Sequence, residues 1–159
     1  MTITLIANTD SEMQDWGARL AACCQAPMLI YLSGELGAGK TTFVRGFLGA
    51  LGHQGLVKSP TYTLIEPYQW DDRLVYHLDL YRLKTPSELD HLGFWDLLQE
   101  KAIVLIEWPS CGGDRLPEPD FHIVITTSQD QNREINLTAK ADKAILLKHL
   151  TQHKANNRG

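Results

Sequence analysis

The stretch Gly34–Thr41 constrains this chain more than any other, because it matches the phosphate-binding pattern G-x-x-x-x-G-K-[ST] at every fixed position. A short apolar run at 28–33 comes before it and predicts a buried strand. The residues at 41–51 that follow place their apolar side chains on one face of a helix. A strand, a glycine-rich loop and a helix in this order are the setting that such a loop needs. The stretch therefore predicts that the chain binds a nucleoside triphosphate.

The residue types in this loop explain how a polyphosphate would be held. Gly34, Gly37 and Gly39 let the backbone turn its N–H groups inward, and the helix that follows adds the positive end of its dipole. Lys40 supplies a positive charge for the outer phosphates, and the Thr41 hydroxyl is a ligand for Mg²⁺. We therefore expect a nucleotide and a magnesium ion at this loop.

Composition narrows the class of protein. The 159 residues, 43% of them hydrophobic, suit one globular domain, and no apolar run approaches the roughly 20 residues that cross a bilayer, so we expect no membrane contact. The three cysteines form neither a metal-ligand spacing nor a disulfide framework, so a reducing cytoplasm is the expected location. A net charge of −4 argues against a chain that grips RNA alone. An RNA-related role would have to be exercised through a partner.

The rest of the chain alternates between predicted helices and strands. Helical patterns occupy 8–24, 41–51, 85–98 and the region after Asp142, and strand patterns occupy 28–33, 61–68, 74–81, 102–106, 121–127 and 133–139. Thr85 is the expected cap of the third helix, with Glu88 reaching back to it, and Gly93 is expected to break that helix. Short turns at 71–73 and 130–132 join neighbouring strands into two antiparallel hairpins.

These elements predict an α/β fold, a three-layer P-loop NTPase-type domain with a mixed, mostly parallel central sheet and antiparallel hairpins. The continuous apolar strand at 102–106 is typical of a sheet covered on both faces. We place a single P-loop ATPase domain at 1–153 and expect the polar C-terminal tail at 154–159 to be disordered.

Glu107 is the first candidate for the carboxylate that such a loop needs near Mg²⁺. It is the only acidic residue that directly ends a buried apolar strand. Its side chain could reach the metal directly or through water, or it could orient an attacking water. The alternative is a surface glutamate that happens to follow a strand.

Asp79 is the second carboxylate to weigh. Strand alternation puts His77, Asp79 and Tyr81 on one face, and a carboxylate in an apolar strand costs stability unless it is paired or liganded. A position near the γ-phosphate and a structural pairing with Arg82 are both open, whereas a metal pair of His77 and Asp79 lacks a third ligand. In the loop at 59–63, Thr61 or Thr63 could sense the γ-phosphate, or this segment could simply begin a strand.

Four blocks of residues, in this order and spacing, resemble the bacterial TsaE family, formerly YjeE. They are Gly34–Phe43, Ser59–Thr63, Tyr76–Arg82 and Ile106–Trp108, and the similar region covers about 32–119. The resemblance implies a small ATPase that works with the TsaD and TsaB proteins to form N6-threonylcarbamoyladenosine on tRNA, next to the anticodon. It also implies that the chain meets tRNA only through those partners.

The resemblance further implies which residues form the site. Thr41 and Glu107 would lie at Mg²⁺, and Asp79 would lie close to the reacting phosphate, so Asp79 and Glu107 are the expected catalytic residues. The implied contacts to ATP are Thr9, Asp10, Leu36, Gly37, Ala38, Gly39, Lys40, Thr41, Thr42 and Arg133.

Two other kinds of nucleotide protein fit the sequence less well. A regulatory GTPase would need a guanine-specific N-K-x-D segment, and the stretch at 139–142 lacks the Asn, while Asp90–Gly93 imitates D-x-x-G inside a predicted helix. A small-molecule kinase would need a lid with several arginines, and the loop at 111–117 offers only Arg115. No arginine adjoins the phosphate-binding loop in an obvious finger position, so we expect slow hydrolysis by the isolated chain.

Overall fold

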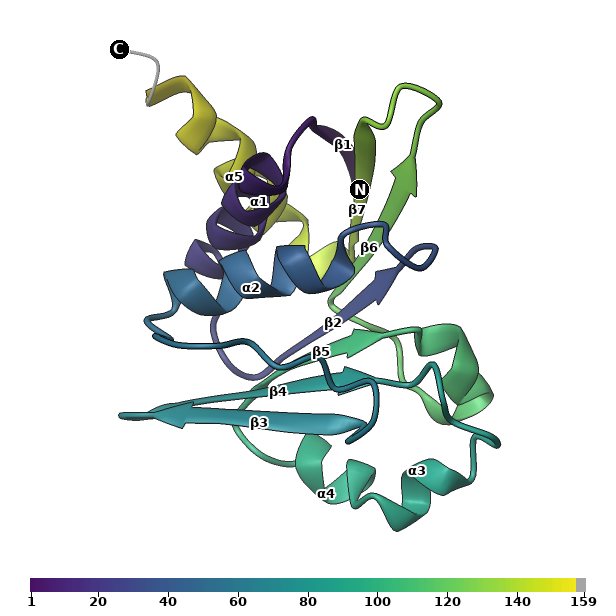
Figure 1. Ribbon diagram of the computed structural model, residues 1–159. Coiled ribbons are helices and arrows are strands. Elements are labelled where there is room, and N and C mark those ends of the chain that lie inside the picture. Colours follow the sequence, from purple (N-terminus) through teal and green to yellow (C-terminus); the bar gives the residue numbers. More distant parts are fainter. Residues whose placement is uncertain (157–159) are drawn as a thin grey trace.

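The computed structural model describes residues 1–156, with side chains up to residue 152. In this part of the chain, seven strands form one sheet in the order β1-β7-β6-β2-β5-β4-β3 (Figure 1). The strands are β1 (Thr2–Ala7), β2 (Met28–Ser33), β3 (Ile65–Trp70), β4 (Arg73–Asp79), β5 (Ile103–Glu107), β6 (Phe121–Thr127) and β7 (Arg133–Ala139). The α-helices are α1 (Asp10–Ala22), α2 (Lys40–Ala50), α3 (Glu88–His91), α4 (Phe94–Leu98) and α5 (Ala144–Asn156), with 3₁₀ turns at Pro109–Arg115 and Ala141–Lys143.

The sheet is mixed, and its centre is parallel. Strand β2 pairs in parallel with both β5 and β6, and β4 pairs in parallel with β5. The antiparallel pairs lie toward the edges, where β3 pairs with β4, β7 with β6, and β1 with β7. This arrangement confirms the predicted fold class and both predicted hairpins. It also brings the carboxyl ends of β2, β4 and β5 to the same edge of the sheet.

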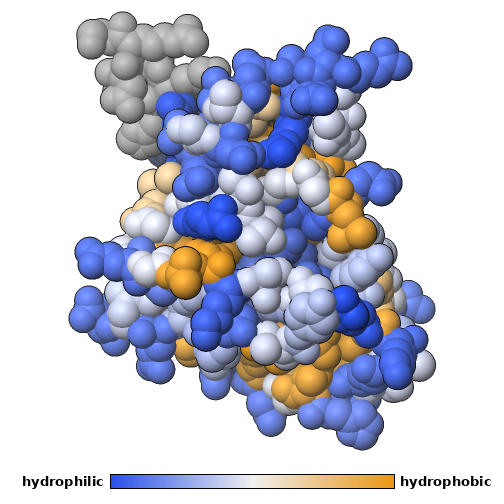
Figure 2. All heavy atoms as spheres, in the orientation of Figure 1, coloured by the Kyte–Doolittle hydropathy of each residue, from blue (hydrophilic) through white to orange (hydrophobic). Residues whose placement is uncertain are grey.

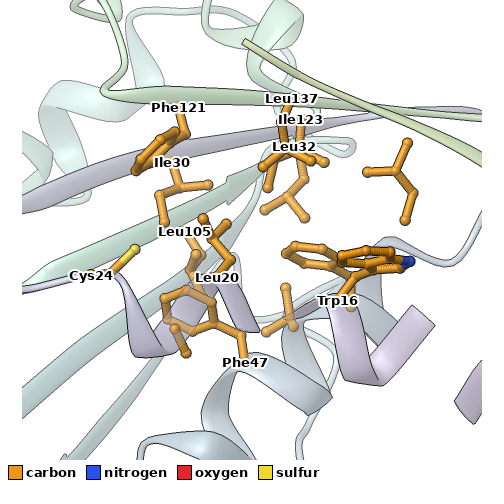
Figure 3. Close-up of a cluster of buried hydrophobic side chains, with 14 of the residues drawn as sticks. Trp16, Leu20, Cys24, Ile30, Leu32, Phe47, Leu105, Phe121, Ile123 and Leu137 are labelled. Atoms are coloured by element: carbon orange, nitrogen blue, oxygen red, sulfur yellow. The ribbon is translucent and has the colours of Figure 1, made fainter. Parts of the chain in front are cut away.

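Helices cover both faces of the sheet and make three layers. Helices α1, α2 and α5 lie on one side, and α3 and α4 lie on the other (Figure 1). On the first side, Trp16 and Leu20 of α1 and Phe47 of α2 pack against Ile30 of β2 and Leu105 of β5 (Figure 3). A second buried cluster fills the opposite side, with members that include Leu78, Leu89, Phe94 and Ile106. On the face drawn in Figure 2, the hydrophobic side chains form only small, separate groups.

Helices α1 and α2 cross with their backbones in contact. A Cβ atom added at Gly46 would lie 2.0 Å from the carbonyl oxygen of Gln14, and one added at Gly17 would lie 2.1 Å from the carbonyl oxygen of Phe43. Any side chain at either position would push the helices apart. The small residues therefore fix how closely the helix that follows the phosphate-binding loop approaches α1.

The segment before β3 differs from the prediction. The strand expected from residue 61 begins only at Ile65, because residues 60–64 form a helical turn in which the Leu64 N–H donates to the Pro60 carbonyl at 2.9 Å. Leu64 itself has φ 67°, a left-handed conformation that does not occur in a regular strand. The neighbouring strand β4 ends at Asp79, two residues earlier than predicted.

Two of the three predicted helix signals after β4 are confirmed. The expected cap is wrong, because a turn in which the Glu88 N–H donates to the Thr85 carbonyl at 3.1 Å comes first, and the N-cap of α3 is Ser87. The carboxylate of Glu88 accepts the backbone N–H of Thr85 at 3.2 Å, and Gly93, with φ 70°, separates α3 from α4. At the C-terminal end, α5 continues to Asn156, beyond the predicted domain boundary at residue 153. The rest of the predicted tail, residues 157–159, lies outside the described residues. No helix within the described residues is long and apolar enough to cross a membrane.

Candidate nucleotide site

A cleft of about 320 Å³ lies where β2, β4 and β5 end, beside the phosphate-binding loop. Parallel strands place their carboxyl ends together, and ligands of open α/β sheets bind at that edge. Every predicted site residue except Thr9 and Ala38 lines this cleft. The lining residues are Asp10, Leu36, Gly37, Gly39, Lys40, Thr41, Thr42, Ser59, Thr61, Asp79, Glu107, Trp108 and Arg133.

The loop between β2 and α2 has the conformation that its glycines predict. Gly37 and Gly39 have φ values of 79° and 110°, which side chains of L-residues rarely allow. Gly39 is the N-cap of α2, so the loop leads directly into a helix N-terminus. Ala38 is buried, and its N–H donates to the Glu35 carbonyl at 3.1 Å, which closes the turn. Ala38 therefore shapes the loop from behind the cleft wall.

Lys40 is drawn back onto its own loop. Its ammonium donates to the Gly34 carbonyl at 2.6 Å and to the Glu35 carbonyl at 2.9 Å, and it lies 4.6 Å from the centre of the Trp108 ring. Burial lowers the pKa of Lys40 from its usual value, and the neighbouring carboxylates act in the opposite direction. The loop thus holds a desolvated positive charge next to the N-terminus of α2, a setting that favours an anion.

Glu107 is buried rather than exposed, so its interpretation as a surface glutamate is wrong. Its Oε2 accepts hydrogen bonds from Nε2 of His77 at 2.6 Å and from the hydroxyl of Thr41 at 3.4 Å. The second contact joins the two residues that were predicted to hold a magnesium ion. They come from different elements, β5 and the first turn of α2.

Asp79 ends β4 and is the register partner of Glu107 on β5. Its Oδ1 accepts the backbone N–H of Tyr81 at 3.0 Å, and its Oδ2 faces the hydroxyl of Thr61 at 3.5 Å. Burial raises the pKa of the Asp79 carboxyl, an effect that the Tyr81 N–H opposes and the charge of Glu107 reinforces. Arg82, the structural partner that the sequence left open, lies instead over the ring of Tyr62, 4.4 Å from its centre.

A cation from the far end of the chain reaches the same cleft. Arg133, the first residue of β7, donates through Nη1 to Oδ1 of Asp10 at 2.7 Å. The same guanidinium nitrogen lies 2.9 Å from the place where a Cβ of Gly39 would be. Thr9 stays outside the cleft as the N-cap of α1, where its side chain accepts the N–H of Glu12 and so supports the position of Asp10.

The donor atoms in the cleft suit Mg²⁺, which also takes ligands from phosphates and water, better than a metal ion bound by protein side chains alone. No group of three or more His, Cys, Asp or Glu side chains within the described residues could hold a metal ion. A hydroxyl from Thr41 and a carboxylate from Glu107 do lie together beside Lys40. Mg²⁺ is usually bound by one or two such oxygens together with substrate phosphates and water, so these residues fit it.

Three residues matter more in the structure than the sequence indicated. Ser59 and Trp108 line the cleft, and Ser59 shares a 2.7 Å hydrogen bond with Thr61. Trp108 adopts a left-handed backbone conformation, with φ 57°, which turns its ring over Lys40. In the sequence, the signal for Ser59 was its position next to Pro60, and the signal for Trp108 was its position next to Glu107. His77, weighed only as a weak metal ligand, contacts the Glu107 carboxylate instead.

A glycine-rich loop between a parallel strand and a helix, with carboxylates at the ends of two neighbouring strands, defines a P-loop NTPase-type domain. Comparison with known proteins places it more narrowly. The chain belongs to the TsaE family, because the family model described as "Threonylcarbamoyl adenosine biosynthesis protein TsaE" matches residues 7–135.

Individual relatives agree with this assignment. The chain is 48% identical over 115 residues to the tRNA threonylcarbamoyladenosine biosynthesis protein TsaE of Haemophilus influenzae, covering 72% of each chain. It is 37% identical over 138 residues to the protein of the same name from Bacillus subtilis, covering 86% of each. The crystal structure of YdiB from B. subtilis matches with a TM-score of 0.84 at 29% identity, covering 97% of both chains.

Proposed function

We propose that this chain binds and hydrolyses ATP in a Mg²⁺-dependent manner, and that it thereby supports the formation of N6-threonylcarbamoyladenosine on tRNA in the cytoplasm. The observation that carries the nucleotide part is the meeting of Lys40, Thr41, Asp79 and Glu107 in one cleft. The printed names of the relatives support the tRNA-modification part.

Each residue of the cleft has a distinct chemical part in this proposal. The loop N–H groups and Lys40 bind the phosphates, and an incoming phosphate replaces the carbonyls of Gly34 and Glu35 as the acceptor for the ammonium. Thr41 and Glu107 would hold Mg²⁺, which supplies neutralisation of the charge on the phosphates. Asp79, whose carboxylate accepts the Tyr81 N–H, would accept a hydrogen bond from an attacking water.

The segment before β3 supports a role for the nucleotide in shaping a surface. Ser59, just before the turn at 60–64, and Thr61 within it both line the cleft, and Thr61 faces Asp79. A γ-phosphate in the cleft would give both hydroxyls a new acceptor and so order the turn, and hydrolysis would release it. We propose that this turn reports the nucleotide state to the TsaD and TsaB proteins.

The negative net charge of the chain supports an indirect contact with tRNA. Its net charge is −4, which gives no electrostatic footprint for a phosphate backbone. The basic side chains at the cleft also have partners of their own, because Lys40 is bound by loop carbonyls and Arg133 by Asp10. In our proposal the tRNA is therefore bound by the partner proteins.

Two measurements test the proposal. Calorimetric titration of the chain with ATP and with GTP, each with Mg²⁺ and with EDTA, should show Mg²⁺-dependent binding that favours ATP. A reconstituted modification reaction with TsaD, TsaB and tRNA should then complete repeated rounds only when this chain and ATP are both present. Efficient repeated modification without the chain would contradict the proposal, as would tighter binding of GTP or the phosphorylation of an added small molecule.

A further inference from the structure

A buried histidine stands behind the carboxylate of the proposed magnesium site. His77 lies in the middle of β4, two residues before Asp79, so both side chains point to the face of the sheet that α2 covers. Glu107 on the neighbouring strand points to the same face as its register partner Asp79. The imidazole of His77 is completely buried, and the side chain of Glu107 is 4% exposed.

The contact between the two is short and directed. His77 Nε2 lies 2.6 Å from Glu107 Oε2, and the Thr41 hydroxyl donates to the same oxygen at 3.4 Å. Because a carboxylate can only accept, the proton in the contact is on Nε2. Both donors of this carboxylate therefore meet on Oε2. They fix its rotation and turn the other oxygen, Oε1, away from His77.

A purely structural role for His77 agrees poorly with its other ring nitrogen. Nδ1 is buried and has no hydrogen-bond partner within the described residues. Buried polar atoms nearly always have partners, and an unpartnered one costs stability that an apolar side chain of similar size would not lose. The imidazole is thus poorly suited to this place as a packing residue. Its one hydrogen bond within the described residues is the one with Glu107.

From this geometry we infer that His77 is a positioning residue, which holds the Glu107 carboxylate in the orientation that binds Mg²⁺. The inference rests on the proposed function, because it assumes that Glu107 is a magnesium ligand. Partners that orient a metal ligand typically change metal affinity by about 10- to 100-fold when they are removed. His77 itself would touch neither the metal nor the nucleotide.

Two variants of similar polarity separate positioning from packing. His77→Gln keeps an amide N–H at about the distance from the backbone that Nε2 has, whereas the amide of His77→Asn reaches only as far as Nδ1. The readout is the Mg²⁺ concentration that gives half of the magnesium effect on ATP binding, measured by calorimetry. ATP binding in EDTA and thermal unfolding are measured on the same samples.

We expect His77→Asn to raise the Mg²⁺ midpoint by about 10-fold or more, with ATP affinity in EDTA unchanged. His77→Gln should have a midpoint close to the wild-type value. If both variants keep the wild-type midpoint, or if both shift it equally, His77 only packs and the inference is wrong. Should His77→Asn fail to fold, His77→Leu takes its place in the comparison, since it lacks the donor but suits the apolar surroundings.

The same experiment distinguishes a failure of this inference from a failure of the proposed function. Glu107→Gln and Thr41→Ala serve as reference variants and should weaken the magnesium effect whatever His77 does. A wild-type chain that binds ATP equally well with and without Mg²⁺ would overturn the proposed magnesium site, and the inference with it. If the Mg²⁺ midpoint shifts in Glu107→Gln but keeps its wild-type value in His77→Asn, only the inference about His77 is overturned.

Discussion

Asp79 and Glu107 are register partners at the ends of the adjacent parallel strands β4 and β5, so two buried carboxylates stand side by side at the cleft. Each has its own donor, the Tyr81 N–H for Asp79 and the His77 imidazole for Glu107. Neighbouring buried carboxylates repel each other and lose hydration, both of which oppose folding. This cost at the carboxyl edge is typical of a site that is shaped for a cation rather than for stability.

Replacing Asp79 by asparagine should therefore stabilise the fold while it impairs hydrolysis. The amide in Asp79→Asn is not charged but still offers an oxygen to the Tyr81 N–H. We expect a higher free energy of unfolding at pH 7, a lower turnover number and nearly unchanged ATP affinity. Denaturant unfolding and steady-state ATPase assays measure these quantities. An Asp79→Asn variant that hydrolyses ATP normally would return Asp79 to a structural role.

The pH dependence of the stability of the same variant tests the direction in which the pKa of Asp79 is shifted. Because the pKa of Asp79 is raised in the folded state, the folded chain holds more protons than the unfolded chain between the ordinary and the raised pKa. The contribution of Asp79 to the free energy of unfolding thus falls as pH rises through that window and is constant above it. The stability gained by Asp79→Asn should be largest at neutral pH and shrink as the pH falls toward about 4. A gain that grows in acid would contradict the assigned direction.

Removing the ammonium of Lys40 should weaken nucleotide binding strongly without unfolding the chain. A charged hydrogen bond to phosphate is worth about 1.5–3 kcal/mol, so Lys40→Ala should weaken Mg·ATP binding by roughly tenfold to a hundredfold. The burial that lowers the pKa of Lys40 also means that its charge costs stability at neutral pH, so little stability is at risk. Calorimetry and thermal unfolding test both parts. Lys148→Ala on the exposed side of α5 is the matched control and should bind like the wild type.

Two glycines of α2 should respond in opposite ways to the same substitution. Gly46→Ala would place a methyl group 2.0 Å from the Gln14 carbonyl and force α1 and α2 apart, at a cost of about 1–3 kcal/mol. Gly49 has nothing within 4 Å of such a methyl group, so Gly49→Ala should raise stability by a few tenths of a kcal/mol through helix propensity. Thermal unfolding of the pair measures the contrast. Equal effects would mean that the helices do not meet at Gly46.

Partner proteins should change the rate of hydrolysis. The cleft has Arg133 along one wall, but that guanidinium is engaged by Asp10, and a well-placed arginine can be worth about 10³–10⁵ in rate. We expect slow ATP hydrolysis by the chain alone and faster hydrolysis when TsaD and TsaB are added. Lys40→Ala should stop repeated rounds of tRNA modification. A fast ATPase that does not depend on partners would contradict this prediction.

The sequence predicted the parts of the site that depend on local pattern. The phosphate-binding loop is one continuous stretch between a strand and a helix, and Glu107 directly ends a strand of consecutive apolar residues. Both signals are complete within a short stretch of chain. The pairing of Asp79 with Glu107 is different, because it depends on which strands are neighbours and on their register. Strand alternation showed which way Asp79 points but not what stands beside it.

Long-range contacts account for the remaining differences. Arg133 lies far along the chain from Gly39, and only the resemblance to a family suggested that it reaches the cleft. The threonines at 61 and 63 favour a strand by residue type, yet Pro60 and the left-handed Leu64 close a turn there instead. In that turn Thr61 faces Asp79, a contact that a regular strand beginning at Thr61 would not predict. The structure thus departs from local propensity where it lines the cleft.

The backbone contact between α1 and α2 has a mechanical consequence. Asp10 begins α1 and Lys40 begins α2, and no side chain separates the helices at Gly17 and Gly46. The two helix N-termini that border the cleft should consequently behave as one rigid unit. The turn at 60–64 also borders the cleft, and it is joined to β4 by the hydrogen bond from the Asp79 N–H to the Leu64 carbonyl. We expect a nucleotide that enters or leaves the cleft to displace the turn at 60–64, whereas α1 and α2 keep their positions.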